Sequence, residues 1–462
     1  MKHRKRRILA ALLLPFFAVT LSAKSRKPVA PAAKSDIQIP FKQFTLRNGL
    51  RVVISEDHSA PTYSICVAYD VGSRDEKPGR TGFAHLFEHM MFQGSENVGK
   101  GEHFILIDNN GGGVNGTTNS DRTIYFETLP ANQLDLGLFL EADRMRSLAV
   151  TQANLDNQRN AVQEERRLRV DNQPYGRTFE AVGETAYDNF GYKHSTIGSM
   201  DDLNAASLDD VKNFFKSYYA PNNAVVAVVG DFKTDDVLAK IKKYFEEIPS
   251  QPPAPRPDLT EPQQTAERRK TLEDDFAQIP RLDIVYKIPS YDSPDYMPLN
   301  VAMSILGSGQ SSRLYQKVVK ETQLAQNVFA SAGSRRATGL ASVIALYRPS
   351  VKPEEVEKVI YAEVRKLQTE PVADWELEKV RMRYRHDHAQ QLSSTLARAV
   401  QLAYYTVAWN DPNVINAEEA RLDSVTKDDI LRVAKKYLTE ENRTVITTVP
   451  KLKAATPAAG DH

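Results

Sequence analysis

The sequence contains one pattern twice, and this repeat limits the fold more than any other feature. The segment LNAASLDDVKNFFKSYYAPNNAVVAVV, which begins at Leu203, aligns without a gap with LDSVTKDDILRVAKKYLTEENRTVITTV, which begins at Leu422. The same offset pairs Pro61 with Pro280 near the start of each half. Each copy has helical periodicity, then a polar turn, then a β-branched run typical of a buried strand. A shared offset at both ends indicates duplication, so we expect two homologous α+β domains in tandem.

Breaks in composition predict how the chain is divided. The proline-rich stretch 249–269 cannot continue a helix or a central strand, which favours an interdomain linker. The predicted parts are a signal peptide (1–23), a disordered lead-in (24–36), an N-terminal domain (37–248), the linker (249–269), a C-terminal domain (270–452) and a tail (453–462).

The first residues resemble an export signal. Basic residues 2–7 precede an apolar run over residues 8–21, and the small residues Ser22 and Ala23 follow. The apolar run is short for a transmembrane span, so we expect no stable membrane span after cleavage. An uncleaved N-terminal membrane anchor is the alternative. We therefore predict secretion through the inner membrane, and a periplasmic protein if the source is a Gram-negative bacterium.

Composition narrows the class of protein. Hydrophobic residues make up 41% and charged residues 26% of the chain, which is typical of a soluble globular protein. The net charge of +1 gives no basis for binding nucleic acid, and none is expected as a partner.

The segment GFAHLFEHMMFQGS, residues 82–95, carries the strongest chemical motif. On a helix, His85, Glu88 and His89 share one face, because residues three and four apart lie close in angle. Two neutral imidazoles in this arrangement suit Zn²⁺, and a third protein ligand would leave one position for water. Glu88 stands where a carboxylate could take a proton from that water. The order is the inverted form of the His-Glu-x-x-His helix.

A third ligand has to come from elsewhere in the chain. The segment NAVQEERRLRV places Glu164 and Glu165 on a later predicted helix, and spacing alone does not choose between them. The alternative to a metal site is a pair of satisfied histidines that fall at helical spacing by chance.

These residues resemble a known family. The motif followed by Glu165 is similar to the pitrilysin, insulysin and mitochondrial processing peptidase family of inverted-motif (HxxEH) zinc peptidases. The flanking segments VNGTTNSDRTIYF, EADRM, EERRLRVDNQPYG and YYAPNNAVVAVVGDF agree, and the resemblance covers residues 41–449. It implies one Zn²⁺ per chain, held by His85, His89 and Glu165, with Glu88 as the general base.

The resemblance also implies a fold and a substrate mode. In the short-chain bacterial branch, each domain is a mostly antiparallel sheet covered by helices, and one chain forms half of a clamshell peptidase chamber. An extended peptide substrate would pair with an exposed edge strand, whose unpaired backbone groups accept any extended chain. The residues expected in that strand are Val114, Asn115, Gly116, Thr117 and Thr118.

Tyr125 and Gln158 are expected to hold the metal-binding side chains in position without binding the metal themselves. The family usually has a glutamate where Gln158 stands. An amide still hydrogen-bonds but carries no charge, so a lower metal affinity or rate is expected.

The C-terminal half departs from the family pattern. Active members carry an arginine and, seven residues later, a tyrosine that hold the reacting carbonyl; Val319 and Gln326 stand there instead. Neither side chain can replace that pair. Nearby Arg313 and Tyr315 match the preceding helix pattern and are expected to be structural. At the repeat offset, serines stand opposite both motif histidines, so a single metal site is expected.

Two hypotheses follow. The first is a zinc-dependent endopeptidase subunit that hydrolyses short or unfolded peptides in the cell envelope. It would pair as a heterodimer with a homologous subunit carrying the Arg/Tyr pair. The alternative is a non-catalytic chamber subunit or peptide-binding protein that keeps the fold. Of the other histidines, His386 and His388 lie in a polar helix and are expected to be solvated.

Overall fold

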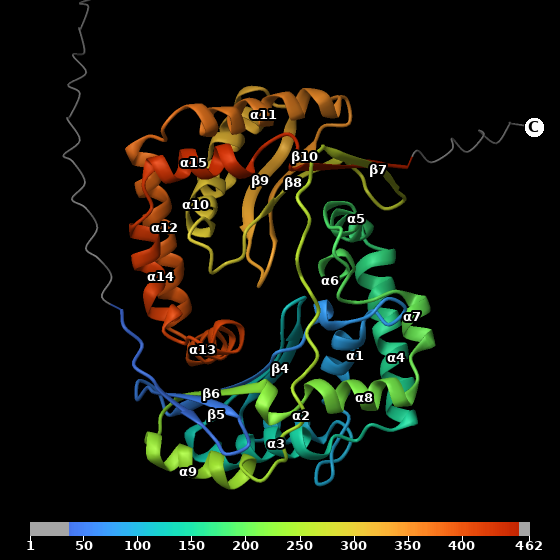
Figure 1. Ribbon diagram of the computed structural model, residues 1–462, viewed down its shortest axis with the longest axis vertical. Coiled ribbons are helices and arrows are strands. Elements are labelled where there is room, and N and C mark those ends of the chain that lie inside the picture. The colour runs from blue at the N-terminus through green and yellow to red at the C-terminus, as the bar shows by residue number, and fades with distance from the viewer. Residues whose placement is uncertain (1–36, 452–462) are drawn as a thin grey trace, which may run out of the picture. The chain divides into compact units, whose positions relative to one another are not determined.

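The computed structural model describes residues 37–451 (Figure 1). The predicted signal peptide, the lead-in 24–36 and the tail 453–462 lie outside the described residues. Within the described range, no helix combines the length and apolar character needed to cross a bilayer.

The N-terminal half is built on a six-stranded sheet. Its strands lie in the order β1-β2-β6-β3-β5-β4, and every neighbouring pair is antiparallel except β2 and β6. The strands are β1 (Lys42–Thr45), β2 (Arg51–Glu56), β3 (Thr62–Tyr69), β4 (Gly113–Thr118), β5 (Thr123–Pro130) and β6 (Ala224–Gly230). β4 therefore lies at an edge, hydrogen-bonded to β5 alone.

The C-terminal half repeats this sheet without the first strand. Its order is β7-β11-β8-β10-β9, with β7 and β11 parallel and the other pairs antiparallel. The strands are β7 (Arg268–Asp274), β8 (Arg281–Ile288), β9 (Ala325–Gly333), β10 (Gly339–Tyr347) and β11 (Arg443–Pro450). The predicted fold class is confirmed: two homologous α+β domains, each with a mostly antiparallel sheet flanked by helices.

Helices cover both sheets (Figure 1). The N-terminal half contains α1 (Phe83–Met90), α2 (Glu102–Asn109), α3 (Leu134–Ser147), α4 (Gln152–Arg166), α5 (Gly176–Ala186), α6 (Phe190–Lys193), α7 (Met200–Ala205), α8 (Leu208–Tyr218) and α9 (Thr234–Phe245). The C-terminal half contains α10 (Tyr296–Gly307), α11 (Pro353–Thr369), α12 (Asp374–Leu392), α13 (Thr395–Trp409), α14 (Val414–Asp423) and α15 (Lys427–Tyr437). Two π-helical segments, η3 (Arg167–Asp171) and η5 (Tyr315–Glu321), follow α4 and precede β9.

The repeated residues make the same contacts in both halves. The Asn223 amide donates to the carbonyl of Tyr218 at 2.7 Å, and the Asn442 amide donates to the carbonyl of Tyr437 at 2.7 Å. Each asparagine also donates to the backbone of an earlier segment, Asp70 just after β3 or Lys287 in β8, and so ties the end of the helix to that strand. Identical hydrogen bonds at paired positions explain why these residues recur at one offset.

One helix from each half packs against the sheet of the other half. Leu402 and Ala403 of α13 pack against Cys66 and Val225 on one face of the N-terminal sheet. In return, α5 packs against β7, β8 and β11, and the Thr178 hydroxyl hydrogen-bonds that of Thr448 at 2.7 Å. The repeat offset places the first residues of α5 and α13 opposite one another. Each half therefore keeps its own main core, and two smaller apolar clusters join residues of both halves.

The proline-rich stretch 249–269 contains no helix or strand before β7 begins. Ion pairs nevertheless connect this stretch to both halves. Arg256 forms an ion pair with Asp70 at 2.8 Å, and Glu261 forms one with Lys287 at 2.5 Å. This stretch is a fixed connection and not a free spacer, because charged contacts hold it at two points.

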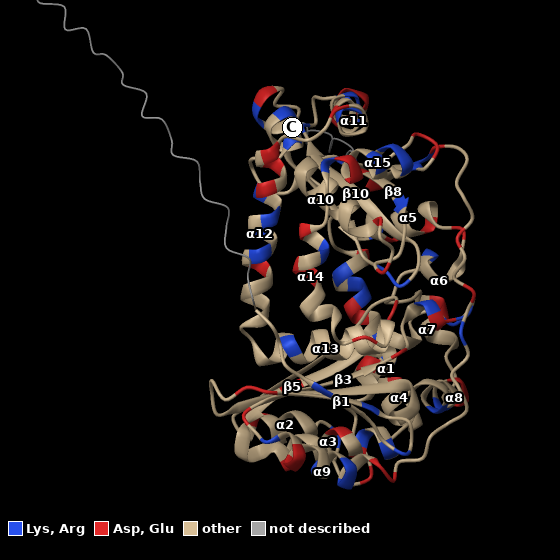
Figure 2. Cartoon of the chain, turned by 60° about the vertical axis from the view of Figure 1, so that its left-hand side comes forward, with Lys and Arg blue, Asp and Glu red and all other residues tan. Residues whose placement is uncertain are grey.

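Charges of both signs are interspersed along α9, α11 and α12 (Figure 2). In α12, His386 is exposed as expected, but His388 is buried. The prediction that both histidines are solvated is therefore wrong for His388. Its face of α12 packs on α10 and α14, and burial lowers the pKa of His388.

Candidate active site

The motif lies on α1, whose start is set by Gly82. Gly82 has φ 88°, and a Cβ there would lie 2.7 Å from the carbonyl oxygen of Ile197, so only glycine fits. The apolar residues of α1, among them Leu86 and Phe87, face the core. The opposite face therefore presents His85, Glu88 and His89 together, as the helical spacing predicted.

A buried carboxylate that the sequence did not single out fixes the start of α1. Glu76 accepts hydrogen bonds from the backbone N–H groups of Gly82 (2.9 Å) and Ala84 (2.8 Å), which the helix itself leaves unsatisfied. Its third partner is the His194 ring, at 2.9 Å. No local motif marks Glu76, because it caps the helix from outside the helix.

Glu165 comes from α4, which packs against α1. Thr151 caps α4: its hydroxyl accepts from the backbone N–H of Asn154 at 3.2 Å. Glu165 lies in the last turn, just before the π-helical segment η3. The neighbouring Glu164 points away from the histidines: its side chain is exposed and pairs with Arg167 at 2.9 Å.

The three predicted ligands converge. Glu165 Oε2 lies 3.5 Å from His85 Nε2 and 3.2 Å from His89 Nε2, and the ligand atoms of all three residues lie within 4.8 Å of one another. The two imidazole rings are 4.9 Å apart. Two imidazoles and one carboxylate, with space for one further ligand, form the usual donor set of a catalytic zinc site.

The electrostatics of these side chains fit a metal. Burial, together with the charge of His89, lowers the pKa of His85 to about 4, so its ring is neutral at pH 7 and keeps a lone pair for an ion. The hydrogen bond from His89 lowers the pKa of Glu165, which keeps that carboxylate ionised. His85 Nδ1 is buried without a hydrogen-bond partner in the described part of the chain. The residues present therefore fit a zinc ion.

Glu88 stands between the ligands and the sheet edge. Burial raises the pKa of Glu88, although a hydrogen bond with Thr118 acts in the opposite direction. A Cβ placed on Gly116 would lie 3.3 Å from Glu88 Cγ, so β4 passes directly against this carboxylate. A carboxylate with a raised pKa is a better proton acceptor, which suits a general base.

The predicted substrate residues 114–118 all lie in β4, the edge strand. Gly116 pairs with Tyr125 across the ladder, and only Gly116 of these five is buried. The outer side of β4 has no strand partner among residues 37–451. Its backbone can therefore pair with an added extended chain.

The two supporting residues lie close by, with different contacts. Tyr125 is fully buried, and its hydroxyl donates to the backbone carbonyl of Phe87 at 3.2 Å, which holds α1 against the sheet. Gln158 is nearly buried in α4 and donates to Asn157 at 2.7 Å. Among the described residues, Gln158 makes no hydrogen bond to a predicted ligand.

Comparisons with known proteins decide the family. A family model described as "Insulinase (Peptidase family M16)" matches residues 51–199, and one described as "Peptidase M16 inactive domain" matches residues 205–384. The zinc protease PqqE of Helicobacter pylori is 31% identical over 445 residues, covering 96% of this chain and 98% of that protein. This chain belongs to peptidase family M16.

Other M16 relatives agree. The crystal structure of a protease from Helicobacter pylori, 31% identical, superposes with a TM-score of 0.86 over 89% of this chain and 100% of that chain. A probable mitochondrial-processing peptidase subunit beta from Arabidopsis thaliana is 24% identical, covering 86% of this chain and 76% of that protein. The motif helix lies in the part matched by the first M16 model.

In the second M16 domain, Val319 and Gln326 stand at the two positions where an arginine and a tyrosine are expected. Val319, in η5, packs against the core of the second sheet, while Gln326 is exposed on β9. Arg313 forms a two-pronged ion pair with Glu376, with both distances 2.7 Å. Tyr315 packs against the same core. Of the two residues near the expected Arg/Tyr positions, Arg313 is thus held in an ion pair and Tyr315 is used in packing.

A second cluster of possible ligands lies buried beneath β4 and β5. His103, Glu127 and Glu141 have donor atoms within 4.8 Å of one another. The guanidinium of Arg144 pairs with Glu141 and lies 4.5 Å from the Tyr125 ring. A buried arginine supplies the positive charge that a cation would bring, so the cluster is a charge-balanced network within the core.

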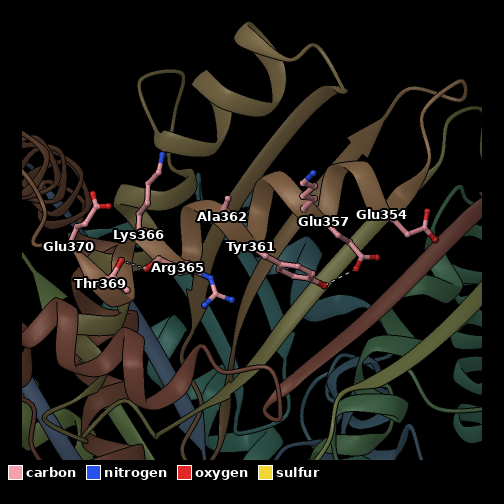
Figure 3. A pocket seen from close by; sticks show the side chains of 9 residues that line it. Glu354, Glu357, Tyr361, Ala362, Arg365, Lys366, Thr369 and Glu370 are labelled. Atoms are coloured by element: carbon pink, nitrogen blue, oxygen red, sulfur yellow. Dashed lines mark hydrogen bonds between the residues drawn. The ribbon is translucent and has the colours of Figure 1, made fainter.

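The hollow on α11 offers no comparable chemistry (Figure 3). Its volume is about 540 Å³, and its lining residues belong to α11 except Glu370, which directly follows the helix. Glu357 already pairs with Arg269 at 2.6 Å and accepts from the Tyr361 hydroxyl at 2.9 Å. Lys366 pairs with Glu363 at 2.7 Å. Glu357 and Lys366 are thus already paired within the chain.

Proposed function

We propose that this chain is a zinc-dependent endopeptidase subunit that hydrolyses short or unfolded peptides. The observation that carries the proposal is the meeting of Glu165 Oε2 with both Nε2 atoms of His85 and His89, while Glu88 lies between them and the open strand β4. The names of relatives, "zinc protease" among them, support the same reading.

Different residues of the chain would bind the metal, transfer the proton and align the substrate. His85, His89 and Glu165 would hold one Zn²⁺, which when bound supplies a Lewis acid for the scissile carbonyl and a water of lowered pKa. Glu88 takes the proton of the attacking water and later gives it to the leaving amine. Val114 to Thr118 align an extended peptide by backbone hydrogen bonds, a mode that favours unfolded chains because it needs a free backbone.

We further propose a heterodimer. Val319 has no hydrogen-bond donor, and Gln326 has neither the charge of arginine nor the phenol of tyrosine. Loss of one such donor lowers turnover on the order of a hundredfold. A homologous partner would supply the Arg/Tyr pair. One M16 relative is itself named as a subunit, the beta subunit of a mitochondrial-processing peptidase. The basic and apolar N-terminal residues support export and a periplasmic location.

The decisive experiment separates metal binding from turnover. The chain is purified alone and with a candidate partner, and zinc content and cleavage of an unfolded peptide are measured. Glu165→Gln should lose zinc, whereas Glu164→Gln, its exposed neighbour, should keep it. Glu88→Gln should keep zinc but lose cleavage by about a hundredfold or more.

The outcomes distinguish the alternatives. Full activity of the chain alone would reject the heterodimer and leave the peptidase. Stoichiometric zinc in Glu165→Gln would reject the ligand set. No zinc and no cleavage with any partner would favour the second candidate, a non-catalytic chamber subunit or peptide-binding protein, which the neutral Gln158 and the two replaced positions also support.

A further inference from the structure

A cavity of about 440 Å³ begins beside the candidate active site. Two of its lining residues belong to the site's immediate neighbours. Arg169 binds Glu165 Oε1 at 2.8 Å, leaving Oε2 for the histidines. Ser120 follows the edge strand β4 by two residues. A peptide that leaves β4 at this end therefore meets the mouth of the cavity.

The cavity extends between α5 and the C-terminal sheet. Its floor is of mixed character: Val285, Leu340 and Ile344 of β8 and β10 are apolar, while Arg281, Asp283 and Ser342 of the same strands are polar. Phe179 of α5 lines it with a 63% exposed side chain. The apolar residues of this floor accommodate the carbon chain of a bound residue.

Most charges around the cavity are neutralised within the chain. Arg281 binds Asp283 at 2.6 Å. Glu180 is held by Arg166, also at 2.6 Å. The cavity-lining His194 is engaged by buried Glu76. These groups are therefore not available to a ligand without breaking an existing pair.

Two cations remain. Among residues 37–451, neither Lys193 nor Arg335 has a carboxylate within 4.0 Å, and both line the cavity. The Arg335 guanidinium lies 4.5 Å from the ring of Tyr192 and 5.1 Å from the ring of Tyr187. Its Nη1 is buried with no hydrogen-bond partner in this range. Aromatic faces hold an arginine in place without neutralising its charge.

We propose that this cavity is a subsite that binds a carboxylate of the peptide substrate through Arg335 and Lys193. The inference rests on the proposed function, because the ligand arrives along β4. The carboxylate has two sources, an acidic side chain or the C-terminus of the peptide. Arginine forms paired, charge-assisted hydrogen bonds with either, and the apolar residues of the floor, Val285, Leu340 and Ile344, receive the adjoining carbon atoms.

The test measures binding and not cleavage. The full chain with Glu88→Gln, loaded with zinc, is titrated into four fluorescent unfolded peptides: Glu or Gln at one position, each with a free or an amidated C-terminus. A carboxylate should tighten binding about tenfold, as expected for charge-assisted hydrogen bonds. The Glu/Gln pair reports a side-chain source, and the acid/amide pair reports a C-terminal source.

Cavity variants locate the effect. Arg335→Gln and Lys193→Gln should each remove most of the preference for a carboxylate and leave binding of the neutral peptide unchanged, and Arg335→Lys should restore part of it. Lys358→Gln, an exposed cation on α11, is the control. If Arg335→Gln does not fold, Lys193→Gln carries the test.

The two proposals fail differently. Equal binding of all four peptides, or a preference that survives both cavity variants, would overturn the subsite while leaving the peptidase intact. A carboxylate preference that depends on the two cations, in a chain that cleaves nothing with any partner, would keep the subsite and reject the catalytic role.

Discussion

Replacing Glu127 by glutamine should change how the stability of the chain depends on pH. Glu127 lies on β5, directly opposite Val114 of the edge strand, and its side chain is fully buried. One oxygen lies 3.3 Å from His103 Nε2, and the other has no hydrogen-bond partner among the described residues. Burial raises the pKa of Glu127 from 4.5 to about 8, although the charge of Arg144 opposes this.

The magnitude follows from linkage. Between pH 4.5 and 8 the folded chain keeps a proton on Glu127 that the unfolded chain releases, so stability falls as pH rises. The loss is about 1.4 kcal/mol per pH unit, or about 2 kcal/mol between pH 6 and pH 7.5. His103 acts in the opposite direction, because burial lowers its pKa to about 3 and the folded ring is neutral while the unfolded ring still binds a proton below about pH 6.5. This contribution is the same with glutamate or glutamine at position 127, so it cancels when the two proteins are compared.

Glu127→Gln removes this dependence, since an amide does not titrate and still hydrogen-bonds to His103. Urea unfolding of both proteins at pH 6 and pH 7.5 measures the effect. The natural chain should lose about 2 kcal/mol more than the variant over this interval. Glu164→Gln, which changes an exposed glutamate, should follow the natural chain. Parallel losses in the natural chain and Glu127→Gln would refute the reasoning, because they would show that Glu127 is ionised in the folded state.

Three further substitutions test other parts of the structure. Gly116→Ala places a methyl group 3.3 Å from Glu88 Cγ, so cleavage should fall by roughly tenfold with zinc content unchanged; full activity would show that β4 does not position Glu88. Asn442→Leu removes two hydrogen bonds to backbone carbonyls and should lower the free energy of unfolding by about 2 kcal/mol. Urea unfolding measures this loss. An unchanged free energy of unfolding would contradict the shared role of the repeated asparagines. Arg313→Gln leaves the carboxylate of Glu376 without its ion pair and should cost about 3 kcal/mol of stability without changing zinc content; lost cleavage at full stability would assign Arg313 a catalytic role instead.

Much of the fold was accessible from the sequence because its patterns are local. The gapless match of residues from Leu203 and from Leu422 predicted two homologous halves, and the sheets indeed share one strand order. The spacing of His85, Glu88 and His89 predicted one helix face, because helix geometry repeats at a constant angle. The polar composition of α12, by contrast, concealed the buried position of His388, which depends on the helices packed against it.

The sequence by itself determined the duplication, the His-x-x-Glu-His motif that is predicted to bind a metal, and the absence of that motif from the second half. The family resemblance singled out Glu165, but only the tertiary structure brings Glu165, and not Glu164, beside the two histidines, since neighbouring residues on a helix point about 100° apart and α4 packs on α1. It also decided that β4 lies at an edge and that each half covers the other's sheet. These properties depend on contacts between residues far apart in the chain, which local patterns do not specify.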